Sequence, residues 1–185
     1  MTLTVIAPPD ALPVSHSDMK DYLRIGHTGE DDLVSALNLA ATQRVESALS
    51  QVLVTQTLER TFDAWPKGLF GRGALLRPSP VSALQSVILS SDETGDEDVT
   101  GRFQVSADRL RLRPWSMTPP VPIGGQIAVR FDAGYGAEQD VPEDLKLAVK
   151  MIAAHDYSGR TLPLSSDALP SAVDDILSVY RRIRL

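Results

Sequence analysis

Residues 126–160, QIAVRFDAGYGAEQDVPEDLKLAVKMIAAHDYSGR, predict a strand, a glycine corner and a helix, and the rest of the chain is organised around them. From residue 126 to 132, apolar and polar side chains alternate, which is the period of a half-buried strand. Gly134 and Gly136 allow the corner, and Pro142 with two acidic residues after it predicts a helix start. Apolar, mostly small residues then recur at three- and four-residue steps. The residues that we expect to pack in a core here are Leu145, Ala148, Val149, Ile152 and Tyr135.

The composition predicts one globular domain. The chain has 185 residues, of which 43% are hydrophobic and 23% charged. A net charge of −6 argues against a protein that binds nucleic acid by neutralising phosphates, although it suits a wall along which DNA slides. The absence of cysteine excludes disulfides and thiolate metal sites. We find neither a standard secretory signal nor an apolar run long enough to cross a membrane.

The order helices, sheet, helices predicts an α+β fold in a single domain of residues 1–185. The expected segments are an extended arm or edge strand at 1–14, helices at 15–52, a β-lobe at 53–132, a helix at 141–160, and a helix with a tail at 170–185. Residues 114–125 are too rich in proline for regular structure.

Local signals predict where the first two helices begin and end. Ser15 or Ser17 can cap the first helix, and Gly26 can end it. Thr28 followed by Asp31 resembles a capping box for the second helix. The apolar face expected for this helix consists of Leu33, Leu37, Ala40, Ala41, Val45, Ala48, Leu49 and Val52.

No local motif indicates catalysis, a cofactor or a metal. His16, His27 and His155 have no partners at ligand spacing, and the acidic run at 92–98 lacks the order of a calcium-binding loop. The glycines of GLFGRG are in the wrong order for a dinucleotide fingerprint, and no GxSxG, Walker A or HExxH motif occurs. A Ser-His-Asp site that forms only in three dimensions stays open, but we expect no enzyme, no cofactor and no catalytic, cofactor-binding or metal-binding residue.

The chain ends in RRIRL, where three arginines alternate with two aliphatic residues behind an amphipathic helix. This pattern fits a tail that docks on a protein. A nucleic-acid contact and a solvated chain end are the alternatives.

Several short pieces, in this order, resemble one family. They are YLRI at 22–25, EDD at 30–32, VE at 45–46, TQT at 55–57, PVS at 80–82, FDAGYG at 131–136, VP at 141–142 with Leu145, Lys146 and Ala148, then Tyr157, Arg160, and ILSVYR at 176–181. The family is that of the head-to-tail connector, or adaptor (head-completion), proteins of long-tailed bacteriophages and phage-derived gene transfer agents. The chain departs from the family at Val179, where the family often has proline, and over 92–125, which matches little beyond a β-like texture.

The resemblance implies a structural protein of the virion without catalysis. Such adaptors form a ring, usually dodecameric, on the portal protein at the head-tail interface, extend the DNA channel and provide a platform for tail attachment. The implied partners are the portal, a stopper or tail-completion protein below, and further copies of the chain, with contacts at the packing residues above. Genomic DNA would pass without specific binding, no membrane would be involved, and synthesis would take place in the cytoplasm of a bacterial host.

We expect the C-terminal helix and tail to bind the portal. The residues predicted to do so are Ile176, Val179, Tyr180, Arg181, Arg182, Ile183, Arg184 and Leu185.

Three alternatives remain from the sequence. The first is a stopper or tail-completion protein of the same neck. The second is a ligand-binding or hydrolytic domain with a cleft beneath residues 114–125. The third is a nucleic-acid-binding packaging factor.

Overall fold

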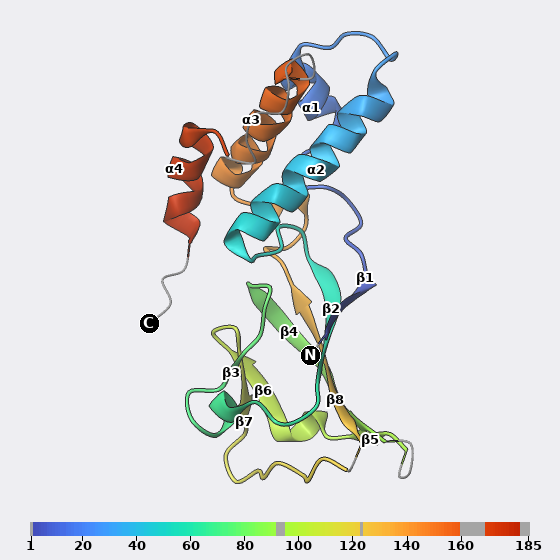
Figure 1. Ribbon diagram of the computed structural model, residues 1–185, viewed down its shortest axis with the longest axis vertical. Coiled ribbons are helices and arrows are strands. Elements are labelled where there is room, and N and C mark those ends of the chain that lie inside the picture. The colour runs from blue at the N-terminus through green and yellow to red at the C-terminus, as the bar shows by residue number, and fades with distance from the viewer. Residues whose placement is uncertain (1, 92–94, 123, 160–168, 182–185) are drawn as a thin grey trace. The chain divides into compact units, whose positions relative to one another are not determined.

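Four α-helices and two antiparallel sheets make up the described part of the chain, so the predicted α+β class is confirmed (Figure 1). The structure is a computed structural model that describes residues 2–91, 95–122, 124–159 and 169–181. The chain divides into two compact units. The sheet unit comprises Met1–Pro9 and Thr55–Tyr135, and the helix unit comprises Asp10–Val54 and Gly136–Leu185. That these units act as one connector domain stays a prediction.

The helix unit is built around α3. Its helices are α1 (His16–Leu23), α2 (Asp31–Leu49), α3 (Glu143–Gly159) and α4 (Ser171–Tyr180). α3 packs against each of the other three helices. It begins after Pro142, whose carbonyl accepts hydrogen bonds from Leu145 and Lys146. The bounds of α3 and α4 therefore agree closely with the sequence prediction.

The predicted helix caps are correct in part. Ser15 caps α1, because its hydroxyl accepts a 3.1 Å hydrogen bond from the Asp18 N–H. Gly26 does not end this helix; Arg24 does, in the left-handed conformation with φ 58°. The capping box of Thr28 and Asp31 is wrong, since Glu30 is the N-cap of α2 and makes no side-chain cap. Asp31 instead bonds to Lys20 on α1.

The apolar face predicted for α2 is correct in part, since Ala41, Val45, Leu49 and Val52 are buried as expected. The residues that it buries are Val34, Asn38, Ala41, Thr42, Val45 and Leu49, whereas Leu33 is 37% exposed and Ala40 and Ala48 are exposed. Two polar residues can lie on the buried face because each finds a partner. The Asn38 amide donates to the Val14 carbonyl at 2.8 Å, and the Thr42 hydroxyl donates to the Asn38 carbonyl at 2.8 Å.

The larger sheet of the sheet unit has the strand order β1-β2-β8-β4-β5, and every pair is antiparallel. Its strands are β1 (Thr2–Ala7), β2 (Gln56–Phe62), β8 (Gln126–Ala133), β4 (Val81–Ser90) and β5 (Glu97–Asp98). The N-terminal arm is thus an edge strand with all six residues exposed. Central β8 buries Ile127, Val129, Phe131 and Ala133 completely, which confirms the predicted alternation.

The smaller sheet has the order β3-β7-β6, with β3 (Ala74–Leu75), β7 (Arg109–Leu112) and β6 (Phe103–Ser106). It buries Phe103 and Leu110. The described residues between β7 and β8 form neither helix nor strand, as the prolines predict. The Trp65 ring stacks on Phe103 at 5.0 Å, and its indole N–H donates to the Pro119 carbonyl at 2.8 Å, so this long connection is anchored at its middle.

The glycine corner after β8 is confirmed. Gly134 and Gly136 both have φ 136°, a conformation that residues with a β-carbon avoid. The Gly134 N–H donates to the Pro80 carbonyl at 2.9 Å. A short 3-10 turn at Glu138–Asp140, which the sequence did not predict, leads toward α3.

Candidate functional site

The predicted docking helix α4 is held in the helix unit by residues other than those proposed to bind a partner. Val173 and Leu177 are fully buried. Val179 is 81% exposed, and Ile176 is partly buried. The apolar side chains of α4 thus divide into two sets, one packed within the unit and one facing solvent. Sequence periodicity revealed the helix but not which residues anchor it.

Tyr180 and Arg181 have partners within the helix unit. Burial raises the pKa of the Tyr180 hydroxyl, and the Asp144 carboxylate, to which the hydroxyl is hydrogen-bonded, raises it further. The Tyr180 carbonyl accepts a 3.2 Å hydrogen bond from Gln51, and the Arg181 guanidinium pairs with Asp174 at 2.6 Å. Arg182, Ile183, Arg184 and Leu185 lie outside the described residues.

The structure places the predicted packing residues of α3 inside the helix unit. Leu145, Ala148, Val149 and Ile152 are each at most 1% exposed. Tyr135, at the glycine corner, is partly buried. A contact of any of these side chains with another copy stays a prediction.

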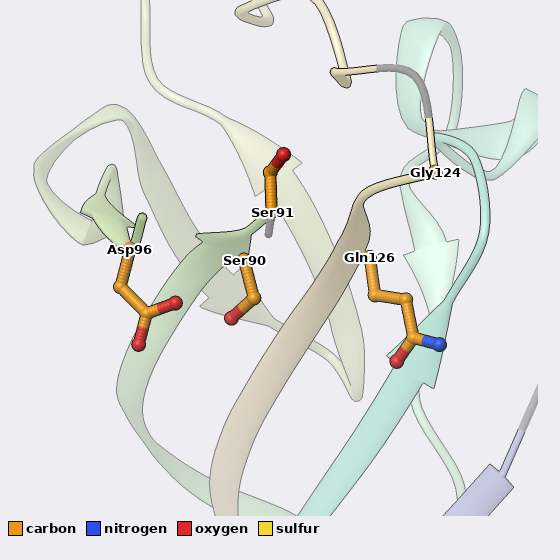
Figure 2. Close-up of a pocket in the computed structure, with 5 residues that line it drawn as sticks. All are labelled: Ser90, Ser91, Asp96, Gly124 and Gln126. Atoms are coloured by element: carbon orange, nitrogen blue, oxygen red, sulfur yellow. The ribbon is translucent and has the colours of Figure 1, made fainter. Parts of the chain in front are cut away.

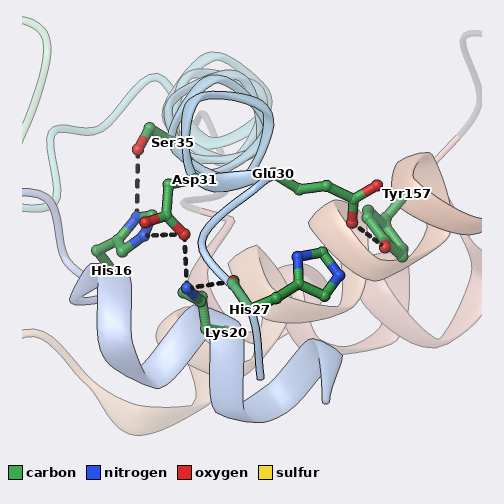
Figure 3. A network of polar contacts seen from close by, with 7 residues as sticks. All are labelled: His16, Lys20, His27, Glu30, Asp31, Ser35 and Tyr157. Atoms are coloured by element: carbon green, nitrogen blue, oxygen red, sulfur yellow. Dashed lines mark hydrogen bonds and ion pairs between the residues drawn. The ribbon is translucent and has the colours of Figure 1, made fainter. Parts of the chain in front are cut away.

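A polar cluster joins α1 to the start of α2 (Figure 3). The Lys20 ammonium donates to the Asp31 carboxylate at 2.5 Å and to the His27 carbonyl at 2.7 Å. The hydrogen bond from Lys20 is the main cause of the lowered pKa of Asp31, and His16 lowers it further. Because this cluster is largely exposed to water, its charges are screened.

Within the cluster, Ser35, His16 and Asp31 lie in the order of a hydrolytic triad. The Ser35 hydroxyl is 3.2 Å from His16 Nδ1, and His16 Nε2 is 3.5 Å from the Asp31 carboxylate. In a hydrolytic triad, a buried carboxylate is hydrogen-bonded to the imidazole and stabilises its protonated form. Here the His16–Asp31 contact of 3.5 Å is longer than the roughly 2.7–3.2 Å of a strong N–H···O bond, and the Lys20 ammonium pairs with the same carboxylate at 2.5 Å. This geometry does not activate the serine.

The sheet unit contains a polar cavity of about 310 Å³ beside the ends of β4 and β8. Its lining residues are Ser90, Ser91, Asp96, Gly124 and Gln126 (Figure 2). It lies near the predicted cleft, because Gly124 belongs to the proline-rich crossing. A small-molecule site is usually lined mainly by apolar groups, whereas this lining is mostly hydroxyl, amide and carboxylate.

The described residues hold neither a metal-binding group nor a membrane-spanning helix. They contain no group of three or more histidine and acidic side chains placed to hold a metal ion. No helix among them is long and apolar enough to cross a membrane.

No family model and no curated protein sequence matches the chain. Solved structures with a similar fold do exist. One similar chain comes from the virion of the native gene transfer agent (GTA) particle, with a TM-score of 0.85 and 24% identity. A second comes from the neck of the empty GTA particle computed with C6 symmetry, with a TM-score of 0.83 and 23% identity. A third comes from the neck of the native GTA particle computed with C12 symmetry, with a TM-score of 0.77 and 24% identity.

Each of these similarities covers 100% of this chain and 97% of the other. The chain therefore shares its whole fold, from the N-terminal edge strand to the C-terminal helix, with chains found in GTA particles.

Proposed function

We propose that the chain is a structural adaptor of a phage or phage-like particle. Copies of it form a ring on the portal protein at the head-tail interface, extend the DNA channel and provide a platform for the tail. The single observation that carries the proposal is the similarity over both full lengths to chains of GTA virion and neck structures. Two of those structures were computed with C6 and C12 symmetry, which supports a ring, and we propose twelve copies.

The distribution of charge is compatible with DNA passing through such a ring. The sheet unit has nine basic and nine acidic residues, whereas the helix unit has nine basic and fifteen acidic residues. The whole net charge of −6 therefore belongs to the helix unit. Negative charge along a channel keeps DNA from adhering, because like charges repel. We propose that DNA passes without specific binding.

We propose that α4 and the residues after it bind the portal. The solvent-facing side chain of Val179, next to the partnered Tyr180 and Arg181, supports this role. Because Val173 and Leu177 hold α4 independently, the tail can engage a partner without unfolding the unit.

The absence of an activated nucleophile around His16, and the polar lining of the cavity at Asp96, support a non-enzymatic role. They weaken the alternative of a hydrolytic or ligand-binding domain.

The test is electron microscopy of the full chain mixed with the portal protein encoded beside it. A coaxial ring on the tail-facing end of the portal is expected. Deletion of residues 181–185, or Val179→Asp, should abolish this ring while the circular dichroism spectrum and melting temperature stay unchanged. The matched control is Ala172→Asp, at an exposed position of the same helix.

Binding that survives both changes would exclude the C-terminal docking mode. An intact portal without any added ring would contradict the adaptor role and favour a stopper, which binds the adaptor instead of the portal.

A further inference from the structure

The smaller sheet presents one face to solvent that combines arginine with apolar side chains. The register pairs Leu75 with Arg109, Arg109 with Ser106, and Arg111 with Gln104, so these five side chains share one face. The other face buries Ala74, Phe103 and Leu110. The solvent face therefore carries Arg109 and Arg111 beside Leu75, which is 38% exposed.

Arg111 is exposed, and within the described residues its guanidinium has no ion pair and no hydrogen bond. The arginines two positions before and after it are both hydrogen-bonded. Arg109 donates to the Gly73 carbonyl at 3.1 Å, and Arg113 donates to the Phe103 carbonyl at 2.9 Å. Arg111 is thus the member of this row that is available to a partner.

Exposed apolar side chains follow the row along the chain. Trp115 is fully exposed, and Met117 is 80% exposed. Their loop is anchored at Pro119 by the Trp65 indole, so both side chains are presented by a fixed segment. Arginine, tryptophan and methionine are the residue types enriched in protein interfaces, and an exposed apolar patch commonly marks one. We call Arg109, Arg111, Trp115 and Met117 the arginine-tryptophan face.

A surface of opposite charge lies at the hairpin between β4 and β5. Asp96, Glu97 and Asp98 are all exposed, and we call them the acidic tip. Asp98 is bonded to Thr100, and Glu97 lies 3.7 Å from Arg102. Asp96 has no hydrogen bond or ion pair within the described residues, and it lines the cavity of about 310 Å³ together with Ser90 and Gln126 (Figure 2).

Arg102 lies between the two surfaces, because its guanidinium is 3.7 Å from the Glu97 carboxylate and donates to the Met117 carbonyl at 3.4 Å. The two surfaces are unlike in chemistry, so one copy can offer the first to the second of a neighbouring copy. Contacts between unlike surfaces repeat from copy to copy and close into a ring when the rotation permits.

We propose that neighbouring copies of this chain meet through these surfaces, with the Arg111 guanidinium of one copy entering the cavity beside Asp96 of the next. The cavity can accept it, because its carboxylate, hydroxyl and amide oxygens are acceptors for the fork of guanidinium donors. Trp115 and Met117 would cover the rim of the contact and exclude water. This inference rests on the proposed ring and specifies how its subunits touch.

Cross-linking tests the contact directly, because the natural chain has no cysteine. The full chain carrying both Arg111→Cys and Asp96→Cys is assembled on its portal, oxidised and separated under non-reducing denaturing conditions. A ladder of dimers, trimers and higher species is expected. Each single-cysteine variant should stay monomeric, and an equal mixture of the two should give dimers only, since every copy then offers one reactive side.

Charge-reversal variants test the same contact through the occupancy of the ring on the portal. Arg111→Glu and Asp96→Lys should each reduce ring occupancy on the portal by roughly tenfold, as for the loss of a close charge pair at an interface. The variant with both changes should restore most of the occupancy, because the attraction is re-established with reversed signs.

The results of these experiments distinguish a wrong Arg111–Asp96 contact from a wrong proposal of a ring. A complete ring without a cross-linked ladder would overturn this inference and leave the proposed function intact. No ring from the natural chain would remove both. If Arg111→Glu instead weakened binding of duplex DNA and left the ring unchanged, the arginine-tryptophan face would be a DNA contact, and the inference would be wrong.

Discussion

The Tyr157 hydroxyl on α3 donates a 2.6 Å hydrogen bond to the carboxylate of Glu30, the N-cap residue of α2 (Figure 3). The two residues are 127 positions apart in the chain. The bond joins the C-terminal part of α3 to the beginning of α2. A second link joins the same helices, since Arg44 donates two hydrogen bonds to Asp156 at 3.1 and 2.9 Å. The helix unit is thus held by polar contacts at its surface as well as by its apolar core.

Tyr157→Phe should lower the free energy of unfolding by roughly 1.5–3 kcal/mol, because it removes a hydrogen bond to a charged group and keeps the ring. Denaturant unfolding measures the change. The control is Tyr22→Phe, at a tyrosine that is 42% exposed, and it should leave the stability unchanged. Equal stabilities of the two variants would contradict a role for the bond.

Leu145→Ala should destabilise the chain by roughly 2–5 kcal/mol, because Leu145 is fully buried in the helix unit and its truncation leaves a cavity. Leu147→Ala, two positions away on the same helix, is the matched control. Leu147 is 41% exposed, so its truncation should cost less than about 0.5 kcal/mol. Thermal unfolding of both variants tests the assigned face of α3.

Glu46→Gln should raise the melting temperature at neutral pH. Burial raises the pKa of Glu46, so the folded chain favours the protonated carboxyl, and ionisation at neutral pH costs stability. The amide keeps an acceptor for the Leu53 N–H, which now bonds to Glu46 at 2.9 Å. The gain should disappear below the ordinary pKa of 4.5. Glu46→Ala should be less stable than Glu46→Gln at every pH, because the Leu53 N–H then loses its acceptor.

Asp31→Asn should lower the melting temperature at neutral pH, and this loss should disappear in acid. The pKa of Asp31 is lowered, chiefly by the hydrogen bond from Lys20, so the pair stabilises the fold at neutral pH. This stabilisation should be lost as the pH falls through the lowered pKa, below 3.8, where the natural chain and the variant should melt alike. Asp32→Asn controls for the charge at the start of α2. A difference in melting temperature between the natural chain and Asp31→Asn that persists in acid would show that the destabilisation is not electrostatic.

Some elements were predictable because their signals are local. Alternation from 126 to 132, the glycine corner, and Pro142 before an acidic turn depend on neighbours within a few residues, and the structure has β8, the corner and α3 where they were predicted. The last helix, Ser171–Tyr180, was located in the same way. Ser15 as a cap also follows from a contact three residues away.

The sequence predictions were wrong where a side chain binds a residue far away in the chain instead of a neighbour. Asp31 could have closed a capping box with Thr28, but Lys20 on α1 binds its carboxylate. On α2, Leu33 is exposed and Asn38 is buried, and the Asn38 amide donates to the Val14 carbonyl. Neither partner is visible from helical periodicity.

The sequence by itself determined the α+β class, the positions of most helices and strands, and the absence of any cysteine chemistry. These follow from short-range periodicity, turn residues and composition. The tertiary structure alone decided the strand order β1-β2-β8-β4-β5, the anchoring of α4 by Val173 and Leu177, and the exposure of Arg111 and Asp96. The physical reason is that strand pairing, burial and surface charge depend on contacts between residues far apart in the chain, which no local pattern encodes.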